Sequence, residues 1–194
     1  MKHMFVIRTQ ESVWGPAGRF ESLADTPLSE EGLAQAHRLA KQLVPHEPTA
    51  IYTSDGDTKR QMARILGKEL KLKPRFNADL AEIDFGLWQG LTIEELSRRQ
   101  PKLCRQWLET PASAMPSGGE AVVDAQHRIC RAVRRILKRV RSDRPILLLR
   151  PVVQALLCCK LENADLDDAW NYAMTDCPWK EYTLRPEQLG RKKE

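Results

Sequence analysis

The sequence predicts an α/β fold in which a mainly parallel central sheet is flanked by helices. Short apolar segments of strand length alternate with longer amphipathic segments of helical period, which is the pattern of a parallel sheet with covering helices. The chain has 194 residues, 42% hydrophobic and 29% charged, as is typical of a globular domain. We expect one domain over residues 1–189 and a short charged tail at residues 190–194.

The first half of the chain supplies two strand and helix pairs. Buried strands are expected at residues 4–7 and 50–53, where the sequence is continuously apolar or β-branched. Ser29 is placed to cap the first helix, with carboxylates in the turn that follows it. The inward stripe of that helix consists of Leu33, Ala36, Leu39, Ala40 and Leu43. A second amphipathic helix is expected at residues 57–70, before Pro74.

The second half is less regular at first and then returns to the same alternation. Thr92 and Glu95 form a capping box for a short helix that stops at Pro101. A long helix, a buried strand, a helix that begins with proline and a last short strand are then expected at residues 120–140, 145–149, 151–161 and 182–184.

Composition excludes several classes of protein. No apolar run approaches the roughly 20 residues that cross a bilayer, and no signal peptide follows Met1, so we expect a cytoplasmic protein without a membrane partner. The five cysteines are odd in number and lack CxxC spacing, which favours buried thiols over a metal site, and no cofactor is expected. The net charge of +5 bears on association with anions and leaves the oligomeric state open.

Polar residues follow three of the expected strands. They lie in the segments at residues 7–12, 52–55 and 149–151. Ligands of doubly wound sheets bind beyond the carboxyl ends of the strands, so these residues are the candidates for a site.

Six segments of the chain, taken in order, resemble the histidine phosphatase superfamily, also called the phosphoglycerate-mutase-like family. They read FVIRTQES, DTPLSEEGLAQA, YTSDGDTKRQMARIL, LAEIDFGLWQGLTIEEL, PSGGEAVVDAQHRI and ILLLRPVVQALL. The resemblance implies a three-layer sandwich and phosphoryl transfer through a histidine nucleophile. It also implies two arginines and a second histidine around the phosphoryl oxygens, and a carboxylic acid that protonates the leaving group. Cations and an in-line nucleophile are what such a transfer needs.

The residues that carry this chemistry are only partly retained. Arg8 matches the first arginine of the family, but Thr9 stands at the nucleophilic histidine and Thr58 at the second arginine. Glu82 matches the acid, and Arg150 stands at the second histidine. The four histidines, His3, His37, His46 and His127, all fall away from the strand ends. Because a hydroxyl without an adjacent base is a poor nucleophile, we expect a catalytically inactive member.

The retained residues are each open to two interpretations. Arg8 either binds an anion or pairs with Glu11 or Glu82, and Arg150 either replaces lost positive charge, with Lys59 and Arg60 near Thr58, or is structural. Several other features are interpreted structurally. These are the turn at residues 118–120, the solvated basic face of residues 128–144, and Trp14 and Trp88 beside the pocket.

We therefore predict a binding or regulatory protein with a residual pocket lined by Arg8, Arg150 and Glu82, which takes an inorganic anion or a phosphorylated small molecule. One alternative is a divergent phosphatase that acts on phosphomonoesters without a phosphohistidine. The other is polyanion binding by the basic helix at residues 128–144, although nucleic acid is disfavoured because no aromatic residues are interleaved with the basic ones.

Overall fold

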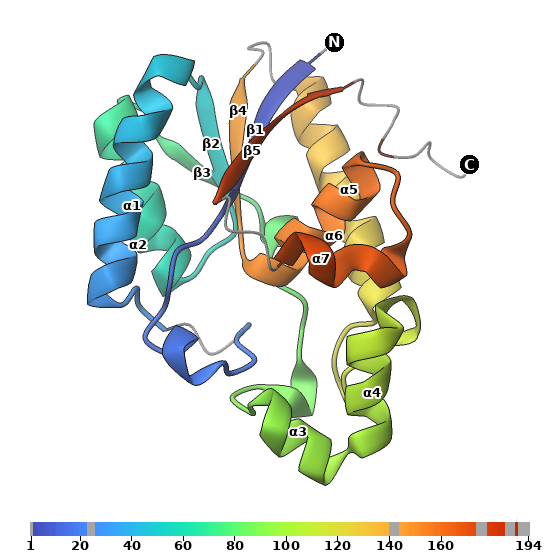
Figure 1. The fold of residues 1–194 in the computed structure, drawn as a ribbon. Coiled ribbons are helices and arrows are strands. Elements are labelled where there is room, and N and C mark those ends of the chain that lie inside the picture. The colour runs from blue at the N-terminus through green and yellow to red at the C-terminus, as the bar shows by residue number, and fades with distance from the viewer. Residues whose placement is uncertain (1, 23–25, 140–143, 174–177, 185–188, 190–194) are drawn as a thin grey trace.

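The centre of the molecule is a five-stranded sheet with the order β3-β2-β4-β1-β5 (Figure 1). The computed structural model describes residues 2–22, 26–139, 144–173, 178–184 and 189. The strands are β1 (Lys2–Arg8), β2 (Ala50–Thr53), β3 (Pro74–Phe76), β4 (Pro145–Leu149) and β5 (Trp179–Leu184). Every neighbouring pair is parallel except β1 with β5. The predicted α/β fold with a mainly parallel sheet is confirmed.

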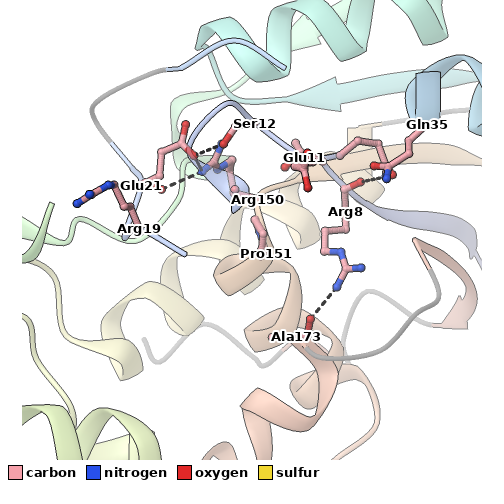
Figure 2. A pocket seen from close by; sticks show the side chains of 12 residues that line it. Arg8, Glu11, Ser12, Arg19, Glu21, Gln35, Arg150, Pro151 and Ala173 are labelled. Carbon is pink, nitrogen blue, oxygen red and sulfur yellow. Dashed lines mark hydrogen bonds and ion pairs between the residues drawn. The ribbon is translucent and has the colours of Figure 1, made fainter. Parts of the chain in front are cut away.

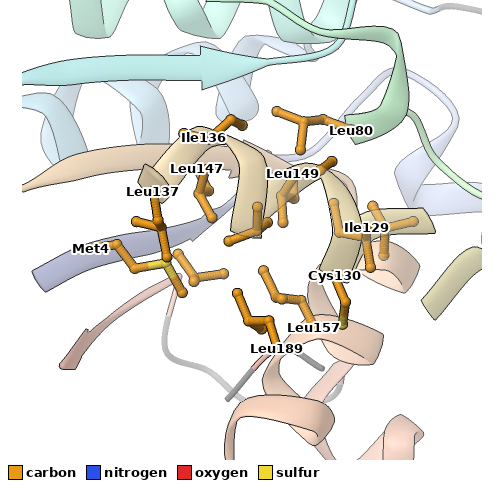
Figure 3. Packing of buried hydrophobic residues seen from close by; sticks show 14 of the residues in the cluster. Met4, Leu80, Ile129, Cys130, Ile136, Leu137, Leu147, Leu149, Leu157 and Leu189 are labelled. Atoms are coloured by element: carbon orange, nitrogen blue, oxygen red, sulfur yellow. The ribbon is translucent and has the colours of Figure 1, made fainter. Parts of the chain in front are cut away.

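Helices cover both faces of this sheet and one of its ends. They are α1 (Glu30–Leu43), α2 (Asp57–Leu70), α3 (Ile93–Arg99), α4 (Pro101–Glu109), α5 (Val122–Arg139), α6 (Pro151–Leu161) and α7 (Ala169–Ala173). Helices α1 and α2 pack on the face that carries Phe5 and Ile7, and α5 and α6 pack on the face that carries Met4 and Val6 (Figure 3 shows this second cluster). Side chains alternate between the faces of a strand, so β1 is buried on both sides.

Most predicted elements have the expected bounds for the expected reasons. Ser29 caps α1 by accepting a hydrogen bond from the Gly32 amide at 3.0 Å, and Thr92 and Glu95 form the capping box of α3. The bounds of β2, α2, β4 and α6 are those predicted. Four of the five cysteines are described, and all four are free and buried, whereas Cys177 and the tail at residues 190–194 lie outside the described residues.

Several expectations need correction. Leu33 is 37% exposed, because α1 turns Gly32 toward the loop after β1 instead. Helix α5 begins two residues later than predicted, and Val140 lies outside the described residues. Strand β5 begins three residues earlier than predicted, and the short elements β3 and α7 had no prediction. Among the described residues, no helix combines the length and the apolar character that crossing a membrane requires.

The topology opens a crevice between β1 and β4. These neighbours are parallel, with Arg8 opposite Leu149, yet the helix after β1 lies on one face of the sheet and the helix after β4 lies on the other. The two segments of the chain that follow β1 and β4 therefore diverge beyond the carboxyl ends of these strands. In open α/β sheets a divergence of this kind is where ligands bind.

Candidate functional site

A cavity of about 360 Å³ lies at the carboxyl ends of β1 and β4 (Figure 2). Its volume is in the range of small-molecule pockets, about 300–1,000 Å³. Arg8, Thr9 and Arg150 line it, and the Thr9 amide donates a hydrogen bond to the Leu149 carbonyl at 2.8 Å. The structure thus brings these three predicted site residues together where the two strands part.

Thr58 lies behind this cavity and does not line it. Its side chain is fully buried in the first turn of α2, where its hydroxyl donates to the Thr26 carbonyl. The same hydroxyl oxygen accepts a 3.4 Å hydrogen bond from Nη1 of Arg150. Arg150 therefore reaches across toward the position at which the family resemblance places an arginine.

Glu82 lies beneath the first turn of α6. Its carboxylate accepts hydrogen bonds from the amides of Val152 and Val153, both at 2.9 Å, and from its neighbour Ile83 at 2.8 Å. Amides in the first turn of a helix have no partner within the helix, so Glu82 satisfies two of them. Burial raises the pKa of Glu82 and outweighs the charge of Arg150 and the three amides, which lower it. Glu82 does not line the cavity, and the expectation that it does so with Arg8 and Arg150 is wrong.

Arg150 is held by an internal ion pair. Its side chain is 9% exposed, and its Nη2 lies 2.7 Å from Oε2 of Glu21 and 3.2 Å from the Glu21 carbonyl oxygen. Figure 2 shows the guanidinium directed toward Glu21. Its Nε has no hydrogen-bond partner and is buried. Because a buried guanidinium needs an anion, Glu21 supplies what a bound phosphate would otherwise supply.

Glu21 is the residue that sequence reasoning missed. Its carboxylate accepts hydrogen bonds from the hydroxyl of Ser12 at 2.6 Å and from the hydroxyl of Thr26. Although burial alone raises the pKa of Glu21, the hydrogen bond and charge of Arg150 and the two hydroxyl groups lower it overall. Glu21 is therefore an ionised, fully engaged carboxylate in the wall of the cavity.

Arg8 is held differently. Its Nη1 donates a 2.6 Å hydrogen bond to the Ala173 carbonyl at the end of α7, and it makes no ion pair with any of the described residues. The proposed pairing of Arg8 with Glu11 or Glu82 is thus not found among these residues. The third lining arginine, Arg19, is paired with Glu95 at 3.3 Å and donates to the Gly90 carbonyl. Of the lining arginines that the structure describes, Arg8 alone lacks a carboxylate partner.

The part of the wall that contains Glu11 is built against the start of α1. The Ser29 amide donates to the Glu11 carbonyl at 3.0 Å, and the Ser29 hydroxyl donates to Oε1 of Glu11 at 2.7 Å. Gly32 allows this approach, because a Cβ there would lie 2.0 Å from the Glu11 carbonyl oxygen. The loop after β1 is therefore fixed against α1, with Glu11 in the wall of the cavity.

Comparison with known proteins decides the family. The profile of the histidine phosphatase superfamily (branch 1) matches residues 4–191. The chain belongs to this superfamily. A curated relative in it, phosphoserine phosphatase 1 of Hydrogenobacter thermophilus, is 28% identical over 172 residues, which cover 89% of this chain and 82% of that protein.

Solved structures of the superfamily agree in fold. Bacillus stearothermophilus YhfR superposes with a TM-score of 0.83 at 28% identity, over 88% of this chain and 84% of that one. A mycobacterial glucosyl-3-phosphoglycerate phosphatase, solved in complex with VO3, superposes with a TM-score of 0.82 at 26% identity, over 93% and 92% of the two chains. The three-layer arrangement predicted from the resemblance is thus confirmed.

In this member of the superfamily, no histidine is among the described residues that line the cavity. His37 and His127 are exposed on α1 and α5, and His46 packs against the rings of Phe5 and Trp179. Thr9 is 4% exposed, and within the described residues its hydroxyl makes no hydrogen bond to a carboxylate or an imidazole. The strand ends therefore present no activated nucleophile at Thr9.

Other features singled out in the sequence have structural roles. Trp88 is fully buried in the cluster around α3 and α4, as a packing residue. Neither Trp88 nor Trp14 is among the described residues that line the cavity, although Gly15, next to Trp14, does line it. The turn at residues 118–119 packs on the Asp84 backbone so closely that a Cβ at Gly119 would lie 2.2 Å from the Asp84 carbonyl oxygen. Trp88 and this turn therefore have packing roles.

The basic face of α5 is partly engaged with its own chain and partly exposed. Arg128 pairs with Glu120 at 2.7 Å and donates to three backbone carbonyls, and Arg135 pairs with Asp79 at 3.0 Å. Arg131, Lys138 and Arg139 are exposed, and Arg141 lies outside the described residues. This arrangement favours the solvated face over a polyanion site.

Proposed function

We propose that this chain is a member of the histidine phosphatase superfamily that binds a phosphomonoester or inorganic phosphate without forming a phosphohistidine. The difference in pairing between its two strand-end arginines carries the proposal. Arg150 is neutralised by Glu21, whereas Arg8 lines the same cavity with no carboxylate partner among the described residues. A guanidinium with free donors is the side chain best suited to a phosphate.

The relatives support a phosphorylated or oxyanionic ligand. Two of them carry the names of phosphatases for small phosphorylated molecules, and one of these was solved with VO3. The cavity at the ends of β1 and β4 is the corresponding place in this fold for an anion, and its size suits a small molecule. The ligand class proposed from the sequence, a phosphorylated small molecule or an inorganic anion, is retained on these grounds.

The residues at the strand ends argue against the covalent route. Thr9 and Arg150 stand where the resemblance places the two histidines. Glu82 is not directed into the cavity, because its carboxylate accepts hydrogen bonds from three backbone amides. Catalytic groups that act as a unit lose many orders of magnitude in rate when one is absent. Binding without turnover is the function that these contacts support best.

One observation favours the phosphatase alternative. The Ser12 hydroxyl lines the cavity and donates a 2.6 Å hydrogen bond to the Glu21 carboxylate, which places a hydroxyl beside a base. Two contacts weaken this arrangement as a catalyst. The pKa of Glu21 is lowered, and its oxygens already accept from Arg150 and Thr26, so it is a poor acceptor for the serine proton.

Two measurements on the purified chain test this proposal: the binding of inorganic phosphate and the hydrolysis of a phosphomonoester. By titration calorimetry at fixed ionic strength, the wild type should bind inorganic phosphate, and Arg8→Met should weaken binding about 10- to 100-fold, the worth of a hydrogen bond to a charged group. Arg38→Met, which removes a cation paired with Glu31 on exposed α1, is the matched control and should bind as the wild type does. With p-nitrophenyl phosphate, the wild type should release no more product than Ser12→Ala or Glu82→Gln.

The two halves of the experiment can fail separately. Phosphate binding that is absent, or unchanged in Arg8→Met, overturns the binding proposal. Turnover by the wild type that Ser12→Ala abolishes assigns the phosphatase alternative to the Ser12 and Glu21 pair. Turnover that Glu82→Gln abolishes restores Glu82 as a catalytic acid.

A further inference from the structure

The cavity contains two charges of opposite sign that do not pair with each other. Arg8 has no ion-pair partner, and Glu11 makes no ion pair either, among the residues that the structure describes. The other charged residues of the wall are used internally, since Arg150 is paired with Glu21 and Arg19 with Glu95. Within the described part of the chain, one lining cation and one lining anion are left without an ion-pair partner.

Glu11 retains capacity to bind a donor. Its Oε1 accepts the Ser29 hydroxyl at 2.7 Å, which fixes the carboxylate in the wall and leaves Oε2 without a hydrogen bond from the described residues. An ionised carboxylate has about four acceptor positions, and one donor occupies only one of them. Figure 2 shows Glu11 and Arg8 among the side chains that line the cavity, with the Arg8 guanidinium directed toward Ala173, which also lines it.

Two of the surrounding polar side chains are neutral amides. Gln35 projects from α1 into the same wall, and the Gln10 side chain donates to the Arg8 carbonyl at 3.0 Å, so its amide oxygen is left to accept. Neutral amides can contact either end of a ligand without adding charge. The Arg150 guanidinium, more than nine-tenths buried in the wall, also keeps one N–H without a partner.

We propose that the ligand is a small zwitterion, an aminoalkyl phosphate whose phosphate binds Arg8 and whose ammonium group binds Glu11. This inference rests on the proposed function, because it assigns the second end of the same ligand. A ligand with phosphate alone leaves the Glu11 carboxylate without a counter-ion in the cavity, whereas an ammonium group on the same ligand supplies one. Unpaired charges that flank a cavity select the ligand that supplies the opposite charge at each end.

Two ligands that differ mainly in the ammonium group test this inference. O-phosphoethanolamine carries it and ethyl phosphate does not, and both are titrated calorimetrically at fixed pH and ionic strength. The wild type should prefer O-phosphoethanolamine about fivefold, since a partly exposed ion pair contributes up to about 1 kcal/mol. Glu11→Gln should abolish this preference while ethyl phosphate binds as before or more tightly, because the amide oxygen can still accept from Ser29.

Controls separate this effect from general electrostatics. Glu30→Gln removes an exposed negative charge from the first turn of α1, outside the cavity, and should keep the fivefold preference. Arg8→Met should weaken both ligands alike. β-Alanine, a zwitterion with a carboxylate, should bind more weakly than O-phosphoethanolamine, and equal or tighter binding would assign a carboxylate zwitterion in place of the phosphate ester.

The outcomes distinguish this inference from the proposed function. Equal binding of the two phosphate esters by the wild type, with both weakened in Arg8→Met, overturns the zwitterion and leaves the phosphate site in place. A preference that persists in Glu11→Gln overturns the role of Glu11. If neither ester binds, the proposed function fails and this inference fails with it.

Discussion

The two arginines at the strand ends occupy neighbouring positions but opposite environments. Arg150 follows β4 and is buried against Glu21, with Thr58 behind it. Arg8 ends β1, and among the described residues its guanidinium hydrogen-bonds the Ala173 carbonyl and pairs with no carboxylate. Both line one cavity. A guanidinium beside a crevice is therefore no evidence of an anion site by itself. What matters is whether the protein already supplies the counter-ion.

The different environments of the two arginines show how the charges of a pocket in this superfamily can be rearranged. A cation at the second strand end, where the resemblance implies a histidine, brings a charge that must be compensated. In this chain the compensation comes from Glu21 on the loop after β1, supported by Ser12 and Thr26. At one strand end of the pocket the arginine forms an internal ion pair, and at the other the arginine has no ion pair with the residues that the structure describes.

The largest expected effect comes from breaking the internal pair. Glu21→Gln leaves Arg150 buried without a counter-ion and should lower the free energy of unfolding by about 3–5 kcal/mol, measured by urea denaturation at pH 7. Glu31→Gln breaks the exposed pair with Arg38 and should cost less than about 1 kcal/mol. Similar small losses in both variants would show that Arg150 does not depend on Glu21.

A smaller expected effect is the pH dependence of stability, which should differ in sign between the buried carboxylates of Glu21 and Glu82. The pKa of Glu21 is lowered in the folded chain, so its stabilising contribution is present above the ordinary glutamate pKa of about 4.3 and is lost as the pH falls through the folded value. The pKa of Glu82 is raised, so its contribution is present below that ordinary pKa and is lost as the pH rises through the folded value.

Unfolding free energies over a pH series test these signs. The stability of the wild type relative to Glu21→Gln should decrease toward acid pH, and its stability relative to Glu82→Gln should decrease toward neutral pH. Two differences that change with pH in the same direction would contradict the opposite environments assigned to the two side chains.

Local signals in the sequence predicted most of the fold. Ser29 and Thr92 mark helix starts because their caps need only the next three residues, and the apolar run before Arg150 predicts a buried strand for the same local reason. Strand β3 escaped prediction because it has three residues, and β5 was shortened because Lys180 and Glu181 are exposed on an edge strand. Such elements are defined by their neighbours more than by their own pattern.

The sequence predicted the position of the site but not the ion pairs of its arginines. Strand ends and the family resemblance placed Arg8, Thr9 and Arg150 at the crevice, where the structure has them. The partner of Arg150 could not be found in this way, because Glu21 is 129 residues away along the chain in a loop without periodicity. Glu82 shows the same limit, since its sequence position says nothing about whether its carboxylate faces the cavity or the amides of α6.

A crystal structure determined with inorganic phosphate is the most direct test of whether an anion binds at Arg8 while Arg150 stays with Glu21. We expect phosphate within hydrogen-bond distance of the Arg8 guanidinium, and a distance from Nη2 of Arg150 to Oε2 of Glu21 that is still close to 2.7 Å. Phosphate bound to Arg150, with the Glu21 carboxylate displaced from the guanidinium, would contradict the assignment of the anion site to Arg8.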